Sequence, residues 1–545
     1  GPVIEDGFYY DFVFPRGFTD EDLARIEARM QEIAKRDHPV NRSVMPRNEA
    51  IEFFRKQGEE YKARIIEAIP VDENISLYRQ GEFVDLCRGP HVPSTGKLKA
   101  FKLTKVAGAY WRGSEYNKML TRIYGTAFFS QEDLDHYLWM QAEAKKRDHR
   151  KLGKELELFL FSPSVGSGFP LYMPKGWLMR NELEKWIVAE KQARGYQFVW
   201  TPHVAKSSIY KQSGHWAKYD AMMSPMKIDD DEYVVKPMNC PHHFQIYNES
   251  PRSYRDLPLR LAEIATVYRY EKAGEVNGLL RVRAVTQDDT HTFVRHDQIT
   301  EEIDRVVELT KHVYKTFGFD NYRARISVRD LHSPDKYMGD PKVWEQAEAS
   351  LKEAVKRHRL PYFVGEGEAA FYGPKIDIVI KDAIGRDWQL TTIQLDFVQP
   401  DNFNMVYTSE SGKKVRPAVL HIAILGALDR FLGILIEHYG GAFPLWLSPV
   451  QVTLLPISES ELAYTSEVAN KLKVAGIRIE IDEDNATLGK KLVRAHESRV
   501  PYAAIIGKKE VETKSITIKN RAGEQSTLTL EEAIAKLGQE VSSKV

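Results

Sequence analysis

The sequence predicts a multidomain protein that combines α+β and α/β architecture. Between residues 263 and 397, segments such as EIATVYRY and KIDIVIKD alternate apolar and polar residues between short turns, a pattern typical of an antiparallel sheet. After residue 448, the segments VQVTLLPI, IRIEIDE and YAAIIG alternate with helical patterns, which favours a small α/β domain. The length of 545 residues corresponds to roughly three or four domains.

The N-terminal part mixes short strands with helices. A helix is predicted over 19–36, where Thr19 caps a first turn rich in Asp and Glu. A long charged helix is predicted over 131–159. It is either a solvated connection or, through its basic middle at 145–154, a contact for an RNA backbone. The predicted domains are 1–146, 147–447 and 448–545.

The composition restricts the class of protein. Lys and Arg together number 77, as do Asp and Glu, so the formal net charge is zero. A neutral total leaves a nucleic-acid partner open, because phosphate contacts come from local basic faces. Two cysteines cannot build a disulfide framework, and no apolar run approaches the length of about 18 residues that a membrane helix needs. These features predict a cytoplasmic protein that does not enter a membrane.

The first residues, GPVIEDGFYYDFVF, are strand-like and aromatic, with no leading cap. Gly1-Pro2 is therefore either a cleavage scar or the start of a cut through a longer protein. We favour the cut.

One predicted strand places five polar side chains on the same face. In RVRAVTQDDTH, strand alternation points Arg281, Arg283, Gln287, Asp289 and His291 to one side. This row is too polar for a core face. It is either a solvated face or the floor of a pocket for a ligand with phosphate and amine groups.

The preceding predicted strand ends in YRYE and supplies Arg269 and Glu271, followed by a glycine-containing loop. Arg269 and Arg281, twelve residues apart across this hairpin, could clamp a polyphosphate with bidentate hydrogen bonds.

Further polar residues lie on the next two predicted strands. AFYGPKIDIVI places Tyr372 and Lys375 at the mouth of a strand, and WQLTTIQLDF presents Gln389 and Gln394. A spacing of five breaks strict alternation, so a bulge near Thr391-Thr392 is needed to bring both glutamines to one side. Simple cross-strand hydrogen bonding is the alternative role for them.

The segment AVLHIAILGALDRF reads as a strand end or a turn that leads into a helix. His421 and Arg430 are nine residues apart, which places them on opposite sides of one continuous helix at about 100° per residue. If both serve one site, His421 must precede or begin the helix. Gly426 is predicted inside that helix, where it lowers stability but lets a flat ring lie against the backbone.

The stretch VVKPMNCPHHF holds Cys240, one of the two cysteines, directly before His242 and His243. Cys240 alone is compatible with a metal thiolate, a catalytic nucleophile or a small buried residue.

Together these segments resemble a known family. The YRYE hairpin, the helix that begins in GALDRF and the long upstream helix with its strand ending at Pro202 resemble motifs 2, 3 and 1 of class II aminoacyl-tRNA synthetases. KPMNCP, RVRAVTQDDTH, AFYGPK, WQLTTIQLDF and AVLHIAILGALDRF are similar specifically to the threonyl-tRNA synthetase family. The resemblance implies an antiparallel-sheet catalytic core with helices, a C-terminal α/β anticodon-binding domain and a partial N-terminal editing domain.

The resemblance also implies one Zn²⁺ per subunit, bound by Cys240, His291 and His421. Three protein ligands leave a position open, as in functional zinc sites. Threonine would chelate the zinc through its amino and hydroxyl groups, whereas valine lacks the hydroxyl and would be rejected. Asp289 would receive the substrate ammonium. His242 and His243 are predicted bystanders, and His242 stands where the family often has Gly.

The remaining implied roles concern ATP and the adenylate. Arg269 would hold the α-phosphate, Arg430 the γ-phosphate and Arg281 the β- and γ-phosphates, with Glu271 near the adenine. Mg²⁺ would bridge the phosphates, and Lys375 joins Arg269 and Arg430 as a predicted catalytic residue. The residues predicted to line the threonyl-adenylate pocket are Met238, Gln287, Tyr372, Lys375, Gln389 and Gln394.

The N-terminal segment DLCRGPHVP carries a C-x-x-x-H pair. In the family this pair combines with an upstream H-x-x-x-H in the editing domain, and the present sequence begins after the place of that element. Editing of seryl-tRNA is expected, because serine differs from threonine by one methyl group, worth about 1–3 kcal/mol of discrimination. Asp85, Cys87 and His91, with Lys62, are the predicted remnant of that site, and editing by this chain is predicted to be impaired or absent.

The family further implies a homodimer formed through motif 1, with tRNA(Thr), ATP and L-threonine as partners. In the C-terminal domain, Lys490, Lys491 and Arg494 share one predicted helix, where they either meet phosphates or form a solvated face.

Two rival functions stay open: a synthetase-like RNA-binding protein without catalysis, and a sister ligase for proline or serine. Intact Arg269, Arg430 and zinc positions disfavour the first, and the Cys–His–His set disfavours the second.

Overall fold

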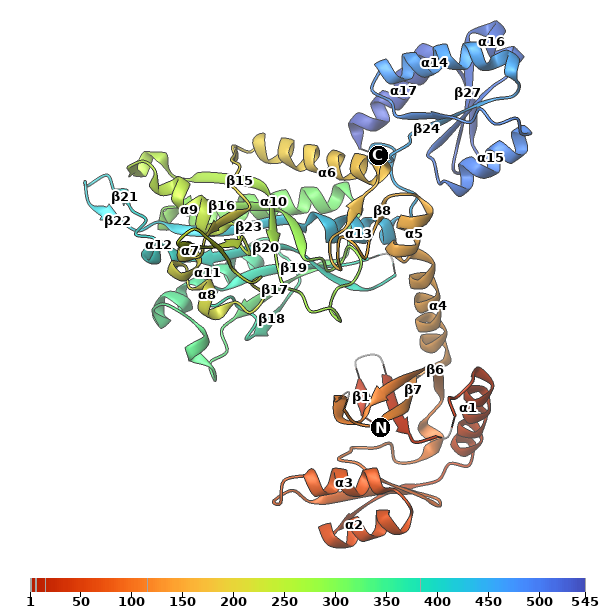
Figure 1. Cartoon of the computed structure of the whole chain (residues 1–545), viewed down its shortest axis with the longest axis vertical. Helices are drawn as coiled ribbons and strands as arrows, with labels where there is room; N and C mark the ends of the chain where they lie inside the picture. Colours follow the sequence, from red (N-terminus) through yellow and green to blue (C-terminus); the bar gives the residue numbers. More distant parts are fainter. Residues whose placement is uncertain (1, 5–6, 15, 115, 383, 545) are drawn as a thin grey trace. The chain divides into compact units, whose positions relative to one another are not determined.

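The computed structural model describes all residues except 1, 5–6, 15, 115, 383 and 545. Gly1 of the predicted Gly1-Pro2 start therefore lies outside the described residues. The chain divides into two compact units, Gly1–Ala142 and Glu143–Val545, whose elements are shown in Figure 1. The boundary falls inside helix α4 (Gln131–Arg147).

The N-terminal unit contains two antiparallel sheets. Their strand orders are β1-β2-β7-β6 and β3-β4-β5. The first sheet is formed by β1 (Val3–Ile4), β2 (Gly7–Phe12), β7 (Met119–Phe128) and β6 (Ala100–Tyr110), and the second by β3 (Val40–Met45), β4 (Ile75–Gln80) and β5 (Phe83–Leu86). The helices are α1 (Asp20–Lys35), α2 (Arg47–Lys56) and α3 (Glu60–Ala68). Thr19 caps α1 in a capping box with Asp22, which confirms the predicted helix start.

The long charged helix predicted over 131–159 is wrong in its length. The helix α4 ends at Arg147, and a second helix, α5 (His149–Glu155), begins after Asp148. The Asp148 carboxylate accepts a hydrogen bond from the Arg150 amide at 2.8 Å, so it caps α5 and breaks the continuous helix. A short strand, β8 (Phe159–Leu160), then pairs with β9 (Leu171–Tyr172).

The centre of the larger unit is an eight-stranded sheet in the order β10-β15-β16-β23-β20-β19-β17-β18. Adjacent strands are antiparallel except β10–β15 and β17–β18, which confirms the predicted antiparallel sheet. The strands are β10 (Gln197–Phe198), β15 (Leu259–Tyr268), β16 (Ala284–Val294), β23 (Ala418–Ala427), β20 (Asp387–Asp396), β19 (Lys375–Lys381), β17 (Tyr322–Val328) and β18 (Tyr362–Glu366). The longer helices are α6 (Pro174–Gln192), α9 (Cys240–Asn248), α10 (Ile299–Thr316), α11 (Pro341–Arg357) and α13 (Leu428–His438).

Shorter elements complete this part of the unit. The short helices are α7 (Ser207–Gln212), α8 (His215–Lys218) and α12 (Gln399–Asn402). One small sheet is β11 (Val204–Lys206), β13 (Asp231–Val235) and β12 (Met226–Ile228), and the other is β14 (Arg252–Ser253), β21 (Tyr407–Thr408) and β22 (Lys414–Val415).

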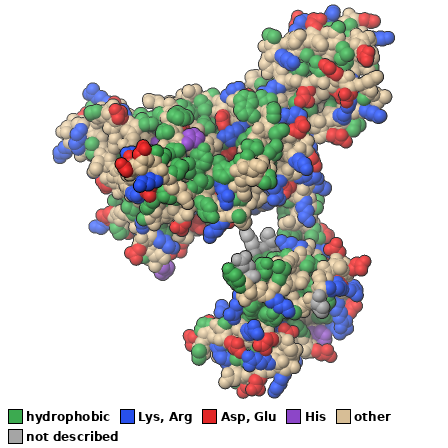
Figure 2. Space-filling view, viewed as in Figure 1, with side chains coloured by type: hydrophobic (Ala, Val, Ile, Leu, Met, Phe, Trp, Pro, Cys, Tyr) green, Lys and Arg blue, Asp and Glu red, His purple; other side chains and the backbone are tan. Residues whose placement is uncertain are grey.

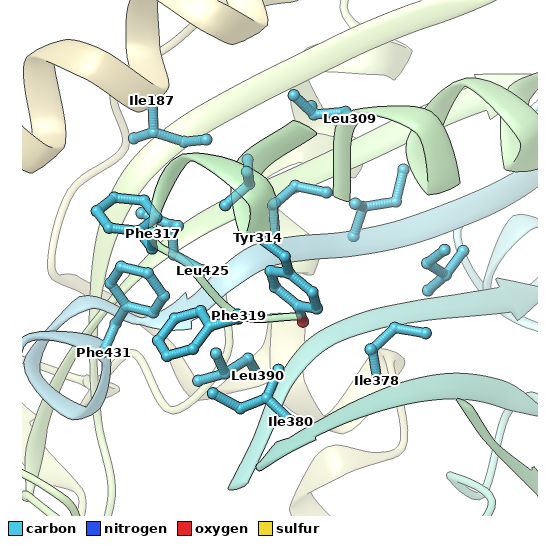
Figure 3. Packing of buried hydrophobic residues seen from close by; sticks show 14 of the residues in the cluster. Ile187, Leu309, Tyr314, Phe317, Phe319, Ile378, Ile380, Leu390, Leu425 and Phe431 are labelled. Atoms are coloured by element: carbon cyan, nitrogen blue, oxygen red, sulfur yellow. The ribbon is translucent and has the colours of Figure 1, made fainter. Parts of the chain in front are cut away.

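One face of the large sheet is covered by a hydrophobic core. Figure 3 shows Phe317, Phe319 and Phe431 beside one another, with Leu390 and Ile380 of the sheet below them. The three phenylalanines are essentially inaccessible to solvent. At roughly 25 cal/mol per Å² of buried apolar surface, such rings hold the helices against the sheet and leave its opposite face free for polar residues.

The predicted bulge in β20 is present. Gln389 pairs with Val379 and Thr392 with Asp377, so β20 contains one extra residue between Gln389 and Thr392. The hydroxyl of Thr391 donates to the Ile424 carbonyl at 2.6 Å, which holds the irregular segment against β23. The extra residue turns both predicted glutamines to the same face.

A second irregularity lies in β23, where Gly426 was predicted to be helical. That prediction is wrong: Gly426 is the penultimate residue of the strand and has φ +73. A Cβ atom there would approach the Leu390 carbonyl oxygen to 2.8 Å, so both the backbone conformation and the space favour glycine. The turned backbone needs hydrogen-bond acceptors, and Asp288 supplies them.

Asp288 is a fully buried carboxylate on β16. It accepts hydrogen bonds from the amides of Ile424, Leu425 and Gly426 at 2.9 to 3.1 Å. The buried Lys191 ammonium lies 2.9 Å from the same carboxylate. This pair holds the last part of β23 in place, directly before helix α13 begins.

The C-terminal part is an α/β fold with strand order β25-β24-β26-β27-β28. The first three strands are parallel and the last two add an antiparallel hairpin. Its strands are β24 (Val452–Pro456), β25 (Ile479–Ile481), β26 (Tyr502–Ile506), β27 (Ser515–Asn520) and β28 (Gln525–Thr529), and its helices are α14 (Leu462–Val474), α15 (Leu488–Glu497), α16 (Lys508–Thr513) and α17 (Leu530–Ser543). On the face seen in Figure 2, its Lys and Arg side chains are interspersed with Asp and Glu.

None of the helices in the described part of the chain is long and apolar enough to span a bilayer.

Candidate active site

The polar face of the large sheet lines a cavity of about 510 Å³. Strands β16, β19, β20 and β23 form its floor, and the start of α13 and the segment before α9 contribute to its walls. Every residue that the sequence predicts for the metal, ATP and adenylate sites lines this cavity. These are Met238, Cys240, Arg269, Glu271, Arg281, Gln287, Asp289, His291, Tyr372, Lys375, Gln389, Gln394, His421 and Arg430.

Cys240, His291 and His421 bring one sulfur and two imidazoles together. One ligand atom from each lies within 4.8 Å of the others, and all three residues are buried. The register of β16 and β23 places His291 directly opposite His421, and Cys240 is the first residue of α9. His421 therefore lies on a strand well before the helix, as a shared site with Arg430 requires.

The surroundings of this group favour a cation. Burial raises the pKa of the Cys240 thiol, and the nearby Asp289 and Asp396 raise it further. Burial also lowers the pKa of His291 far below its usual value. Metal binding needs a thiolate and neutral imidazoles. The His291 imidazole is already neutral, and a bound cation would stabilise the thiolate form of the buried sulfur.

Asp396 orients one of the imidazoles. Its carboxylate lies 2.8 Å from Nε2 of His421 and accepts the backbone amides of Val398 and Gln399 at 2.8 and 3.0 Å. A carboxylate that already accepts two amides is ionised, so it accepts a hydrogen bond from Nε2–H of His421. The lone pair on Nδ1 of His421 then stays free. One thiolate and two imidazoles fit a zinc site with an open position.

Three arginines, Arg269, Arg281 and Arg430, line another part of the cavity. Arg430 donates from Nε to the Leu280 carbonyl at 2.9 Å. Burial lowers the pKa of Arg430, and the nearby Arg269 and Arg281 lower it further. Glu271 pairs with Arg281 at 2.7 Å. Among the described residues no carboxylate lies in ion-pair distance of Arg269 or Arg430, so this part can accept an anion.

The predicted row of polar residues on β16 is only partly correct. Gln287, Asp289 and His291 lie on the strand and line the cavity. Arg281 precedes the strand but also lines the cavity. Arg283 does not line it, because its guanidinium donates to the carbonyls of Glu271 and Ser167 at 2.9 and 3.3 Å. The alternation argument fails there because the strand begins only at residue 284.

A buried carboxylate, Asp377, positions two of the predicted pocket residues. It lies 2.9 Å from the Lys375 ammonium and 2.8 Å from the Gln389 amide nitrogen. It also accepts the Thr392 hydroxyl at 2.8 Å and pairs with Arg325 at 2.9 Å. Arg325 in turn donates to the Gln389 amide oxygen at 2.6 Å, so both ends of that amide are fixed.

We therefore expect Asp377→Asn to destabilise the protein by about 3–5 kcal/mol, because it leaves two partly buried cations, Lys375 and Arg325, without their buried carboxylate. The measurement is the urea midpoint of the unfolding transition. The matched control is Asp387→Asn in the same strand pair, whose carboxylate is half exposed and pairs with Arg323 and Lys381. The control should change stability by less than about 1 kcal/mol, and equal effects of the two variants would contradict the role given to Asp377.

Three family models match the chain. The tRNA synthetase class II core domain (G, H, P, S and T) matches residues 224–439, the anticodon binding domain matches 451–540, and the threonyl and alanyl tRNA synthetase second additional domain matches 75–124. A threonine–tRNA ligase of Chloroherpeton thalassium is 49% identical over 100% of this chain and 84% of its own length. One from Listeria monocytogenes is also 49% identical, over 99% of this chain and 85% of its own length. The chain belongs to the threonine–tRNA ligase family.

Solved structures agree with this family. The RNA-binding domain of threonyl-tRNA synthetase from Cryptosporidium parvum superposes with a TM-score of 0.70 at 36% identity, over 72% of this chain and 98% of that one. A putative threonyl-tRNA synthetase from Aeropyrum pernix gives a TM-score of 0.65 at 28% identity, over 73% and 97% of the two chains.

His215 is one of the cavity residues that the sequence did not predict. His215 is fully buried and hydrogen-bonds through Nδ1 to the Ser213 hydroxyl at 2.7 Å. Its Nε2 has no partner among the described residues. Burial lowers its pKa to about 3, so the ring is neutral. A single histidine at the start of the short helix α8 carries no periodic signal, and only the folded chain places it beside the cavity.

The predicted editing remnant lies in the N-terminal unit and is partly assembled. Lys62 pairs with Asp85 at 3.0 Å, and the Tyr10 hydroxyl, which the sequence analysis missed, donates to the same carboxylate at 2.6 Å. His91 stacks on Tyr78 with ring centroids 4.1 Å apart. Within the described residues, Cys87 and His91 join no third potential metal ligand.

The structure removes one of the three predicted phosphate contacts on helix α15. Lys491 is buried and donates to the carbonyls of Pro456 and Asp482 at 3.0 and 2.8 Å. Arg494 pairs with Asp482 and Asp484. The helical pattern placed these cations on one helix, but it did not show that Lys491 is buried or that carboxylates of the neighbouring turn pair with Arg494.

Proposed function

We propose that this chain attaches L-threonine to tRNA(Thr) in an ATP-dependent reaction through a threonyl-adenylate. The observation that supports this most strongly is the single cavity that joins an anion-binding arginine group to a Cys–His–His donor set. A ligase of this family needs both ends, one for the triphosphate and one for the amino acid. The organisation that we propose is an editing remnant over 1–146, a catalytic domain over 147–447 and an anticodon-binding domain over 448–545.

The amino-acid end is built by residues that read threonine. Zn²⁺ held by Cys240, His291 and His421, when bound, supplies a Lewis acid for the amino and hydroxyl groups of threonine. Asp289, whose pKa is raised by burial, lines the cavity beside this group and accepts the substrate ammonium once a cation is near. Tyr372 closes the same end, with its ring centroid 5.2 Å from that of His421.

The nucleotide end neutralises the triphosphate. Arg269 binds the α-phosphate and Arg430 the γ-phosphate, while Arg281 contacts the β- and γ-phosphates and Glu271 lies near the adenine. Mg²⁺ that enters with ATP supplies further positive charge. The threonine carboxylate attacks the α-phosphorus, an oxygen–phosphorus bond forms, and the bond to the β-phosphate breaks to release pyrophosphate. Lys375 and the glutamines Gln287, Gln389 and Gln394, with Met238, surround the adenylate.

In the second half-reaction, the terminal ribose hydroxyl of tRNA(Thr) attacks the acyl carbon and AMP leaves. The C-terminal domain binds the anticodon, and two chains associate through the region of α6 and β10 as a homodimer in the cytoplasm.

The test is ATP–pyrophosphate exchange with threonine, serine, proline and valine, before and after zinc removal with a chelator. Exchange with threonine that is lost with zinc and restored by its addition is the expected result. Exchange with proline or serine in preference to threonine would assign a sister ligase. Tight tRNA binding without any exchange would assign a binding protein.

The N-terminal site leads to a separate prediction. We expect a protein made of these 545 residues to hydrolyse seryl-tRNA poorly or not at all, because Cys87 and His91 lack further ligands among the described residues. Release of serine from preformed seryl-tRNA(Thr) measures this activity. Its control is aminoacylation by the same preparation, which should be intact. Rates equal to those of a longer family member would contradict this prediction.

A further inference from the structure

His243 lies in a buried chain of hydrogen bonds that ends at a predicted metal ligand. It is fully buried on α9, three residues after Cys240. Its Nδ1 atom lies 2.9 Å from Nδ1 of His291, and its Nε2 atom lies 3.1 Å from Oε2 of Glu263. The two imidazole rings meet nearly at right angles, at 85°. The sequence predicted His243 to be a bystander, and no role in the proposed reaction has used it.

Glu263 stays ionised and accepts a hydrogen bond from His243. Burial raises the pKa of this carboxyl, but hydrogen bonds from His243, Asn239 and the Thr201 amide outweigh burial and lower the pKa to about 2. Thr201 donates its amide to Glu263 at 2.8 Å. The ionised carboxylate only accepts, so it favours a proton on Nε2 of His243.

The position of that proton determines the tautomer of His291. With the proton of His243 on Nε2, its Nδ1 carries a lone pair and accepts from Nδ1–H of His291. The lone pair of His291 is then on Nε2. This is the nitrogen left to face Cys240 and His421, because Nδ1 is already engaged by His243.

The same geometry contains an opposite arrangement. Nδ2 of Asn239 lies 3.0 Å from Nε2 of His243. The Asn239 amide can therefore donate a hydrogen bond to Nε2 of His243 when Nε2 carries no hydrogen. His243 then donates from Nδ1 to His291, and Nε2 of His291 carries the hydrogen. Only the first arrangement leaves a lone pair on Nε2 of His291 for a metal.

We propose that Glu263 and His243 are positioning residues that hold His291 in its metal-binding tautomer. This inference rests on the proposed zinc site and goes beyond it, because it gives the site a relay of the form carboxylate–histidine–histidine. The relay resembles the contact between the Asp396 carboxylate and His421, but it has a second histidine, His243, between the carboxylate and the metal ligand. Groups that orient a metal-bound histidine in this way contribute about 10–100-fold to metal affinity.

The neighbouring His242 provides a matched control. It lies on the same helix and is almost as buried as His243, but neither of its ring nitrogens has a hydrogen-bond partner among the described residues. A substitution there removes an imidazole of equal size and similar burial without touching the relay.

The experiment compares His243→Gln, His243→Asn and His242→Leu in the full chain. An Asn side chain places an acceptor near the position of Nδ1, whereas Gln places its amide near Nε2. Bound zinc is determined by mass spectrometry, and zinc affinity by competition with a chromophoric chelator. Unfolding curves of the metal-free proteins show whether each variant is folded.

We expect His243→Gln to bind Zn²⁺ about 10–100-fold more weakly than the parent, His243→Asn to bind it more tightly than His243→Gln, and His242→Leu to match the parent. The absorption bands of bound Co²⁺ should shift in His243→Gln and not in His242→Leu, because the orientation of His291 changes. If His243→Gln does not fold, Glu263→Gln tests the relay from its other end, with an expected loss of about 10-fold.

Two outcomes separate this inference from the proposed function. A parent protein that binds zinc while its His243 and Glu263 variants bind it equally tightly would overturn the inference alone. A parent protein that takes up no Zn²⁺ would overturn both the relay and the proposed metal site.

Discussion

Cys240→Ser is expected to lose bound zinc and to reduce threonine-dependent ATP–pyrophosphate exchange by at least about 10²–10³-fold, the effect of removing one preorganised electrostatic group. A serine hydroxyl does not ionise at neutral pH and is a poor zinc ligand beside two imidazoles. The fold should persist, because no hydrogen bond joins the Cys240 sulfur to another described residue and the volume change is small. Zinc content, exchange rate and thermal unfolding measure the three effects.

The control for this variant is Cys87→Ser, which replaces the other cysteine of the chain. It lies in the N-terminal unit and should leave zinc content and exchange unchanged. A Cys240→Ser protein with full zinc and full activity would show that Cys240 is only a small buried residue, the third possibility that its sequence context leaves open.

Arg269→Ala is expected to reduce exchange by about 10²–10³-fold, which corresponds to about 2.7–4 kcal/mol of transition-state stabilisation. Among the described residues its guanidinium has only weak contacts, at 3.4 Å to the Met238 sulfur, 3.5 Å to the Pro237 carbonyl and 5.9 Å to the centroid of the Tyr219 ring. It is therefore available to a phosphate, and its removal leaves the developing charge on the α-phosphate uncompensated. Steady-state exchange at varied ATP measures the loss in kcat/KM.

Two comparisons make the Arg269 result specific. Bound zinc should stay at the parent level, because Arg269 is not one of the three residues whose ligand atoms come together at the proposed zinc site. Arg323→Ala removes an arginine that pairs with Asp387 at the surface and should leave exchange unchanged. An Arg269→Ala enzyme with parental kinetics would remove this residue from the nucleotide site.

Many of the residues that line the cavity were predictable because they occupy short segments with a strong local pattern. Strand alternation placed Gln287, Asp289 and His291 on one face, and the spacing of Gln389 and Gln394 required the bulge that β20 contains. The resemblance to the synthetase family selected Cys240 and His421 as partners of His291, a choice that alternation alone could not make. Their predicted chemical roles stay predictions.

The errors have a common physical origin. Arg283 and Lys491 were placed by the period of a strand or helix, which gives the direction of a side chain but not its partner. The carbonyls that bind them come from segments distant in sequence or from a neighbouring turn. Gly426 was assigned to a helix because the segment after it is helical, whereas Asp288, more than 130 residues earlier, stabilises the strand there.

Residue type and periodicity were thus sufficient for the antiparallel sheet and the α/β C-terminal domain, because the repeat of apolar residues is a local pattern that sets side-chain direction. The choice of the cavity residues also needed the resemblance to the family. The roles of Asp377, Asp288 and the Glu263–His243 pair emerged only in the folded chain. Each is a buried polar group whose partners come from other strands or helices, and burial makes such partners necessary. Cys240 and His243 lie three residues apart on one helix, yet only tertiary packing shows that both converge on His291.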